Sequence, residues 1–389
     1  MNYTNHTLRL CVIIFVFCCF ILVPSFSQQL DRPWWYKLEE GKRLYRSGDY
    51  GNALITFEDA RRSRLEQFTR MEQDFILLLS NPDVRPLGDL LEFVERYVAE
   101  RRETAAAAAL AALYHHIPRA SLNGSVKKAL FELDRLKAYP EAEYWLGETY
   151  RAEGELAMAL RQYERALQNR ALLEIPEFDI EIYYKIADIY RIRQNYQEME
   201  KQTLEIVEGR KATGELRDNL WMGNAGGRSS PNQIRVAMAR ILENEGINRF
   251  LTLYRHNYTG TEKAHRLLGF YYGSTSRYQL AAEHLMFAFL IQNTVLVNEV
   301  IRREFDYTFS TLEDLMVFIR SRSELNAFLD DTEYYKTAYY LSSALYASGK
   351  TRPARELWTF LANSYDSGEW GNRARRSATP YIERPLEMP

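Results

Sequence analysis

Two groups of three residues combine side-chain types that are common where proteins bind one another. The first group is Tyr144, Glu148 and Arg151. The second, forty positions later, is Tyr184, Asp188 and Arg191. Spacing of i, i+4, i+7 places each group on one face of a helix. Tyr and Arg are enriched among residues that dominate binding energy, which favours a polar binding surface. An ordinary solvated face with acid–Arg pairs, each worth about 0.2–0.5 kcal/mol, explains the same residues, and both interpretations stay open.

Other residues with reactive side chains lack the sequence context that catalysis or metal binding requires. The glycine-rich segment 223–229 follows Met222, where a phosphate-binding loop needs glycine, and Arg228 replaces the lysine of that loop. The six histidines form neither an HExxH motif nor a spaced Cys/His set, and no GxSxG motif occurs. We therefore expect no enzyme activity, no metal site and no cofactor.

Residues 1–27 have the pattern of a secretory signal peptide. Arg9 is followed by the apolar run 10–23, and Ser25 and Ser27 lie where signal peptidase recognises small residues, which predicts cleavage after Ser27. As a helix, the fourteen residues of the run would span about 21 Å, less than the hydrocarbon core of about 30 Å, so an uncleaved anchor is the weaker alternative. No membrane span is expected in the mature chain.

Cysteine usage agrees with removal of this segment. All three cysteines lie inside it, so the predicted mature chain has no disulfide and no thiolate. Lipid attachment at Cys18 or Cys19 is a minor alternative, because a small residue should precede a lipidated cysteine and Phe17 precedes Cys18.

Charge and composition indicate an ordinary globular protein. Hydrophobic residues make up 46% and charged residues 26% of the chain. Cleavage would remove one basic residue, Arg9, which leaves 49 basic against 52 acidic residues. Short basic clusters such as 373–376 lie among acidic residues, so nucleic acid is not an expected partner.

A pattern of small and large residues recurs five times along the chain. A small residue is followed by an aromatic residue or leucine, a turn, a second small residue and a large apolar residue. The five copies start at Gly41, Gly147, Ala187, Gly269 and Ser342. Small residues allow the two helices of a hairpin to approach closely, and glycine at the turn suits a helix end. From the spacing, further degenerate hairpins are expected near 70–115, 116–139, 230–260 and 297–331.

This pattern resembles the tetratricopeptide repeat, a helix–turn–helix unit of about 34 residues, over most of residues 33–368. The resemblance implies an all-α fold, an α-solenoid of stacked antiparallel hairpins in a right-handed superhelix. It also implies a concave groove lined by the first helix of each hairpin. The groove residues implied are Trp35, Lys42, Tyr45, Tyr144, Glu148, Arg151, Tyr184, Asp188, Arg191, Tyr339 and Tyr346. Leu38 and Ser343 occupy equivalent positions, whereas Met199, Ser342 and Leu361 depart from the small residues of the family pattern.

Composition divides the chain into five segments. Segment 214–232 is rich in Gly, Asn and Ser, which predicts a long loop between two helical halves. The last ten residues contain three prolines, which favour a tail that ends the array. The expected order is signal peptide 1–27, helical half 28–213, loop 214–232, helical half 233–368 and tail 369–389.

The resemblance implies a scaffold that binds other proteins. Exported members of this family are typical of bacterial envelopes, so we expect a periplasmic protein with envelope proteins as partners, for example in a flagellar motor structure. One alternative is an accessory protein of a transporter that binds a small ligand near Trp34, Trp35 and Tyr45. Another is a cell-wall-modifying enzyme with an unrecognised site, which would need a carboxyl group of raised pKa in an apolar cleft.

Overall fold

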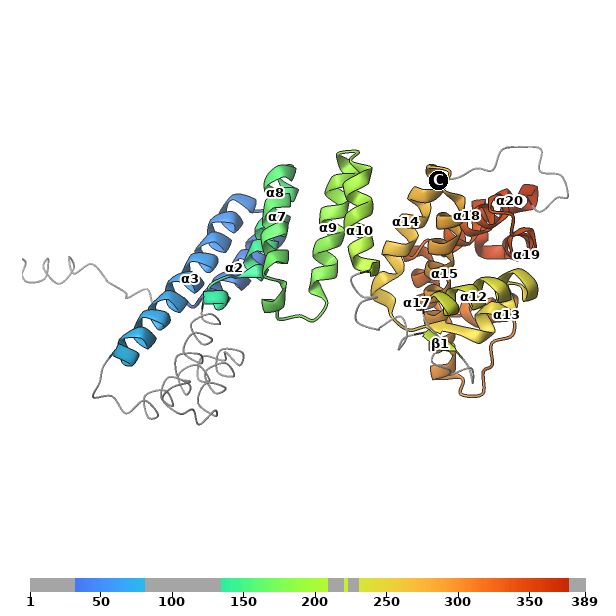
Figure 1. The fold of residues 1–389 in the computed structure, drawn as a ribbon, viewed down its shortest axis with the longest axis horizontal. Coiled ribbons are helices and arrows are strands. Elements are labelled where there is room, and N and C mark those ends of the chain that lie inside the picture. The colour runs from blue at the N-terminus through green and yellow to red at the C-terminus, as the bar shows by residue number, and fades with distance from the viewer. Residues whose placement is uncertain (1–31, 81–133, 209–219, 223–230, 378–389) are drawn as a thin grey trace, which may run out of the picture. The chain divides into compact units, whose positions relative to one another are not determined.

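The computed structural model is almost entirely helical, and the described part comprises residues 32–80, 134–208, 220–222 and 231–377 (Figure 1). The predicted all-α fold class is therefore confirmed. The chain divides into two compact units, 1–176 and 177–389. This boundary precedes the loop 214–232 that composition suggested as the division between halves.

The described part of the first unit consists of two helix hairpins. Its elements are α2 (Trp34–Arg46), α3 (Tyr50–Ser80), α7 (Pro140–Ala152), α8 (Leu156–Gln168) and the short 3-10 helix η1 (Arg170–Leu172). Helix α2 packs on α3, α7 packs on α8, and α3 packs on α7. Pro140 begins α7, at a position where a backbone N–H has no partner within the helix. Arg151 in the last turn complements the helix dipole.

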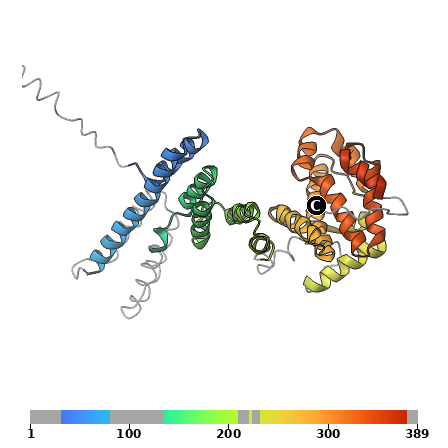
Figure 2. The same cartoon turned by 90° about the horizontal axis from the view of Figure 1, so that it is seen from above.

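The second unit is larger and contains one short pair of strands. Its elements up to η3 are α9 (Phe178–Ile192), α10 (Tyr196–Glu208), β1 (Leu220–Met222), α12 (Pro231–Glu245), α13 (Ile247–Leu253), β2 (Tyr254–His256) and η3 (Thr259–Thr261). The remainder are α14 (Glu262–Ser274), α15 (Tyr278–Arg303), α16 (Leu312–Arg320), α17 (Ser323–Asp331), α18 (Tyr334–Ala347), α19 (Thr351–Asn363), η4 (Tyr365–Ser367) and α20 (Gly368–Ser377). Helices α9 and α10 lie side by side (Figures 1 and 2), and α14 packs on α15.

In three hairpins, a glycine of the first helix lies directly against a large residue of the second. A Cβ atom at Gly147 would lie 2.6 Å from the Tyr163 ring, closer than carbon atoms approach without displacement. The pairs, each sixteen positions apart, are Gly41 with Phe57, Gly147 with Tyr163 and Gly269 with Leu285. The sequence predicted that the two helices approach closely at these glycines. The structure shows which side chain lies against each glycine, namely the large residue on the second helix of the same hairpin.

The five hairpins that the sequence pattern predicted all turn at a residue with positive φ. These residues are Gly48 (81°), Gly154 (85°), Gln194 (57°), Ser276 (60°) and Gly349 (87°). In each turn, the N–H of the residue after the positive-φ residue donates a hydrogen bond to the carbonyl five residues earlier. In the second hairpin, for example, the Glu155 N lies 2.8 Å from the Tyr150 carbonyl oxygen. This bond satisfies a carbonyl at the end of the first helix. Because Gln194 and Ser276 adopt the same conformation, the turn persists where glycine is absent.

Helix α15 is the central helix of the second unit. Leu285, Phe289 and Leu290 on it are fully buried, and both α14 and α18 pack against it. Among the described residues, α15 is the helix that is long and apolar enough to cross a membrane. However, 78% of its apolar window is buried inside the protein, as expected for the core helix of a globular unit.

Further helix pairs occupy two of the four intervals where degenerate hairpins were predicted. Helices α12 and α13 fall in 230–260, and Gly246 between them has a φ of 88°. Helices α16 and α17 fall in 297–331. The intervals 70–115 and 116–139 lie mostly outside the described residues.

Two segments predicted to be irregular contain regular elements. Within the predicted loop 214–232, Leu220–Met222 forms a strand antiparallel to Tyr254–His256, and most of the rest lies outside the described residues. The predicted tail 369–389 begins with α20, which packs on α19, and the ring of Trp370 lies 5.6 Å from that of Tyr339. The prolines that predicted an irregular tail all come after α20, so they do not bear on the residues that form this helix.

Replacing Gly154 by Ala should lower the free energy of unfolding by about 1 kcal/mol, because a side chain strains the left-handed turn. No atom lies within 4 Å of the new Cβ, so the effect is one of backbone conformation. The reverse change, Gln194→Gly, should stabilise the protein slightly. Urea unfolding followed by circular dichroism measures both.

Gly51→Ala is the matched control, because Gly51 lies in helix α3 with equally open surroundings. It should leave stability unchanged or raise it, since alanine favours helix. Equal destabilisation by Gly154→Ala and Gly51→Ala would contradict the role of the turn.

Candidate functional site

A cluster of aromatic and charged side chains lies between α2 and α7 of the first unit. The rings of Tyr45 and Trp145 meet edge to face with centroids 5.4 Å apart. Lys42 Nζ lies 5.8 Å from the centroid of the Trp145 ring. Trp145 also stacks on Phe57 at 6.1 Å, so it joins α7 to both helices of the preceding hairpin. The α2–α7 cluster is defined as Lys42, Tyr45, Tyr144, Trp145, Glu148 and Arg151.

Glu148 is the buried charge of the α2–α7 cluster, with 5% of its surface exposed. Its carboxylate accepts a hydrogen bond from the Tyr163 hydroxyl and pairs with the Arg151 guanidinium at 3.3 Å. Burial of Tyr45 raises the pKa of its hydroxyl, and the Glu148 carboxylate raises that pKa further. Glycine at position 147 permits this arrangement, because it allows the Tyr163 ring to reach α7.

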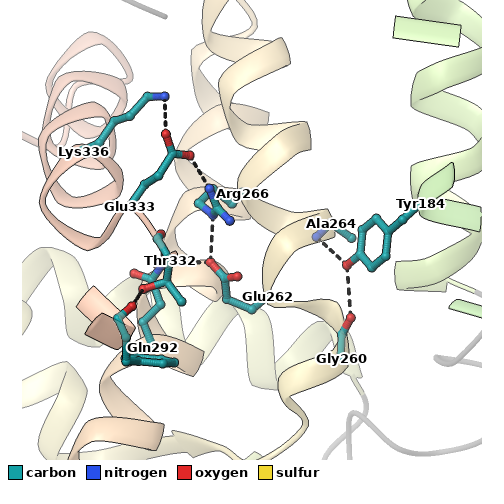
Figure 3. A network of polar contacts seen from close by, with 10 residues as sticks. Tyr184, Gly260, Glu262, Ala264, Arg266, Gln292, Thr332, Glu333 and Lys336 are labelled. Carbon is teal, nitrogen blue, oxygen red and sulfur yellow. Dashed lines mark hydrogen bonds and ion pairs between the residues drawn. The ribbon is translucent and has the colours of Figure 1, made fainter. Parts of the chain in front are cut away.

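The second group of three residues has a different environment. Tyr184 is buried, and its hydroxyl accepts a hydrogen bond from the Ala264 N–H at 2.8 Å and donates one to the Gly260 carbonyl at 3.1 Å (Figure 3). This phenol therefore ties α9 to the start of α14. Asp188 and Arg191 form a solvent-exposed ion pair at 2.6 Å.

Beside Tyr184, a buried polar network links α14, α15 and α18. Arg266 Nε donates to Glu262 at 3.0 Å and its Nη1 donates to Glu333, while Gln292 donates to Glu262 at 2.7 Å (Figure 3). Lys336 completes the network by pairing with Glu333 at 2.7 Å. The charged groups satisfy one another, so the network holds the three helices together.

The remaining predicted groove residues are separated by the structure. Trp35 is 52% exposed at the start of α2 and contacts the ring of Tyr36. In the second unit, Tyr339 is buried against Trp370, and Tyr346 packs on Trp358 with ring centroids 5.4 Å apart. Predicted residues thus come together in the α2–α7 cluster, whereas Tyr184 and Tyr339 belong to the core of the second unit.

Sequence reasoning missed two residues on which this arrangement depends. Trp145 follows Tyr144 directly, so a search at i, i+4, i+7 passed over it, although a tryptophan on the polar side of a helix was a usable signal. Tyr163 is the large residue of the second copy of the repeat pattern, a position expected only to pack, and only the fold shows that its hydroxyl donates to Glu148.

The α2–α7 cluster has the chemistry of a recognition surface. Lys42 and Arg151 keep 20% and 32% of their side-chain surfaces exposed, beside the partly exposed aromatic rings of Tyr45 and Trp145. Cations over aromatic rings and partly desolvated guanidinium groups are frequent in binding hot spots. Among the residues that the structure describes, no three His, Cys, Asp or Glu side chains are grouped to hold a metal ion.

A second carboxyl group on α7, that of Glu143, faces away from solvent. Glu143 is 7% exposed, and its Oε2 has no hydrogen-bond partner. Burial raises its pKa to about 7, although Arg61 and Arg165 oppose the shift. The folded state therefore holds a proton on Glu143 that the unfolded chain releases near pH 4.5.

Because the folded chain binds a proton on Glu143 more tightly than the unfolded chain, this proton stabilises the fold. The stabilisation should be fully present below about pH 4.5 and should be lost as the pH rises through about 7. Glu143→Gln carries no ionisable group, so its gain in stability over the natural chain should grow between pH 5 and pH 8 by about 1–3 kcal/mol. Thermal unfolding across this range measures the difference. Glu164→Gln, which changes an exposed residue of α8, is the control, and its difference from the natural chain should stay constant with pH. A gain for Glu143→Gln that stays constant with pH would contradict the assignment.

No protein-family model matches this chain. Over 342 residues the chain is 26% identical to a protein of Treponema pallidum (strain Nichols) that is described as an uncharacterized protein. The similarity covers 87% of this chain and 88% of that protein, so it extends through most of both units.

Proposed function

We propose that this protein is an exported scaffold of tetratricopeptide-like hairpins that binds other proteins of the bacterial cell envelope. The observation that carries the proposal is the recurrence of one hairpin geometry. Two features repeat along the chain. A glycine of the first helix lies against a large residue of the second, and a left-handed turn follows seven positions after the first small residue. Repeated hairpins stacked into a solenoid offer extended surfaces for partner proteins.

The α2–α7 cluster is the proposed contact surface. Lys42, Tyr45 and Arg151 are partly exposed. Lys42 pairs with Glu39 at 2.6 Å and Arg151 pairs with the buried Glu148, so a partner would meet side chains already fixed in place. Fixed side chains lose little conformational entropy on binding, which raises affinity. Periplasmic location and membership of a large assembly, such as a flagellar motor structure, belong to the same proposal.

The two alternative functions have less support. Trp34, which a small-ligand pocket at this end of the chain would need, is packed against Tyr139 and the Arg64 guanidinium, at 4.7 Å and 4.6 Å. Glu143 has the raised pKa that a catalytic acid needs. Its carboxyl group is buried, however, and Arg61, Arg165 and Asn169 of this chain surround it, so a substrate would not reach it. We therefore propose no second function.

Affinity capture of the tagged chain from its own envelope, followed by mass spectrometry, tests the proposal. The mature N-terminus should be Gln28, and one or more envelope proteins should be enriched. Lys42→Glu combined with Tyr45→Ala should reduce that enrichment about tenfold, because about 1–2 kcal/mol is typical of truncated hot-spot residues.

Lys201→Glu is the matched control, because it reverses an exposed cation on α10 outside the cluster. Capture by this variant should equal that of the natural chain, and thermal unfolding should show that all variants fold. Unchanged capture by the Lys42/Tyr45 variant would remove the cluster from the proposal. Failure of the natural chain to enrich any envelope protein would overturn the scaffold function itself.

A further inference from the structure

An open cleft of about 600 Å³ lies in the second unit, where the chain leaves α15 and enters α16. Acidic residues line the cleft, two from the segment after α15 and one from α16. Every charged residue of its lining is acidic, namely Glu304, Asp306 and Asp314. The cleft shares no residue with the α2–α7 cluster of the first unit, so a ligand of the cleft is independent of the function proposed for that cluster.

The three acidic residues differ in how far this chain neutralises them. Glu304 pairs with the Arg322 guanidinium at 2.7 Å. Asp306 has no ion-pair partner in the described part of the chain. The Asp314 carboxylate accepts a hydrogen bond from the Ser310 hydroxyl, and the Asp314 N–H donates to the Thr311 hydroxyl at 3.2 Å. Hydrogen bonding with these two residues lowers the pKa of Asp314. Two carboxylates of the cleft, those of Asp306 and Asp314, therefore have no ion-pair partner among the residues that the structure describes.

Aromatic and apolar side chains complete the lining. Phe305 is 92% exposed, which makes it the most exposed large hydrophobic residue in the described chain. The rings of Tyr307 and Phe318 pack edge to face with centroids 4.9 Å apart. Val317 of α16, which also lines the cleft, is 65% exposed. A carboxylate beside an uncovered aromatic face attracts organic cations, because ring and carboxylate both favour positive charge.

The geometry favours an organic cation over a metal ion. The acids of the cleft do not converge, since no group of three His, Cys, Asp or Glu in the described residues is placed to hold a metal. A planar guanidinium can stack on a phenyl ring and pair with a carboxylate at the same time, whereas a compact ammonium ion is more strongly hydrated. A protruding phenylalanine and valine also provide apolar contacts for residues on either side of the cation.

We propose that this cleft is a docking site for a partner-protein segment that inserts an arginine between Phe305 and Asp306. Charge complementarity selects the occupant, because the lining offers acids and rings but no cation of its own. Asp314 and the paired Glu304 also line the cleft and attract neighbouring basic residues of the segment. Phe305 supplies the stacking face.

The experiment is calorimetric titration of the full chain with the peptide acetyl-Leu-Arg-Ala-Arg-amide. The same peptide with citrulline in place of arginine keeps the shape and removes the charge. The arginine peptide should bind at least about tenfold more tightly than the citrulline peptide, and added salt should weaken it. Phe305→Ala and Asp306→Asn should each weaken binding about three- to tenfold, as expected for one cation–π contact or one ion pair.

The matched controls are Tyr365→Ala and Asp330→Asn. They remove an aromatic side chain that is 89% exposed and an exposed acid elsewhere on the same unit. Both should leave peptide affinity within about twofold of the natural chain. Equal affinity for the arginine and citrulline peptides, or equal loss in the control variants, would overturn the proposal. So would concentration-dependent dimerisation that Asp306→Asn abolishes, because the cleft would then hold a second copy of this chain.

Discussion

The structure depends on close contact between the two helices of each hairpin. Where glycine lies in the first helix, the large residue sixteen positions later occupies the space that a Cβ atom would fill, as Tyr163 does against Gly147. A hairpin packed this closely buries its large residue completely, and the chain then reverses through one residue with positive φ. The turn and the helix contact support each other, because the positive-φ residue fixes how the two helices align and so brings the glycine opposite the large residue.

Buried charge is the second constraint, and each unit satisfies it with its own groups. In the first unit, the Arg64 guanidinium lies over the rings of Trp34 and Tyr139, and its Nε donates to the Leu136 carbonyl at 2.9 Å. In the second, Arg266 pairs with Glu262 and Glu333. Polar groups at such depth are costly unless they are paired. These contacts therefore leave the buried guanidinium groups of both units with partners.

The two proposed surfaces differ in the charged side chains that they present. The α2–α7 cluster presents Lys42 and Arg151 beside tyrosine and tryptophan, whereas the cleft after α15 presents acids beside Phe305. In the cluster both cations are paired with acids, Lys42 with Glu39 and Arg151 with Glu148. The cleft, in contrast, has acids without a cationic partner in the described chain, so the two surfaces favour different partners. A scaffold that holds more than one protein would gain from such a difference.

The sequence alone determined the helical class, the five hairpins and their turns, because small residues and glycine recur at fixed spacing. It also indicated Lys42, Tyr45, Glu148 and Arg151. Tertiary structure decided which predicted positions remain accessible: Tyr184 and Asp188 share one helix face, yet the start of α14 covers the first and not the second. Spacing along one helix defines a face but not what packs against it. For the same reason, the burial of Glu143 and the uncovered ring of Phe305 could be recognised only in the folded chain.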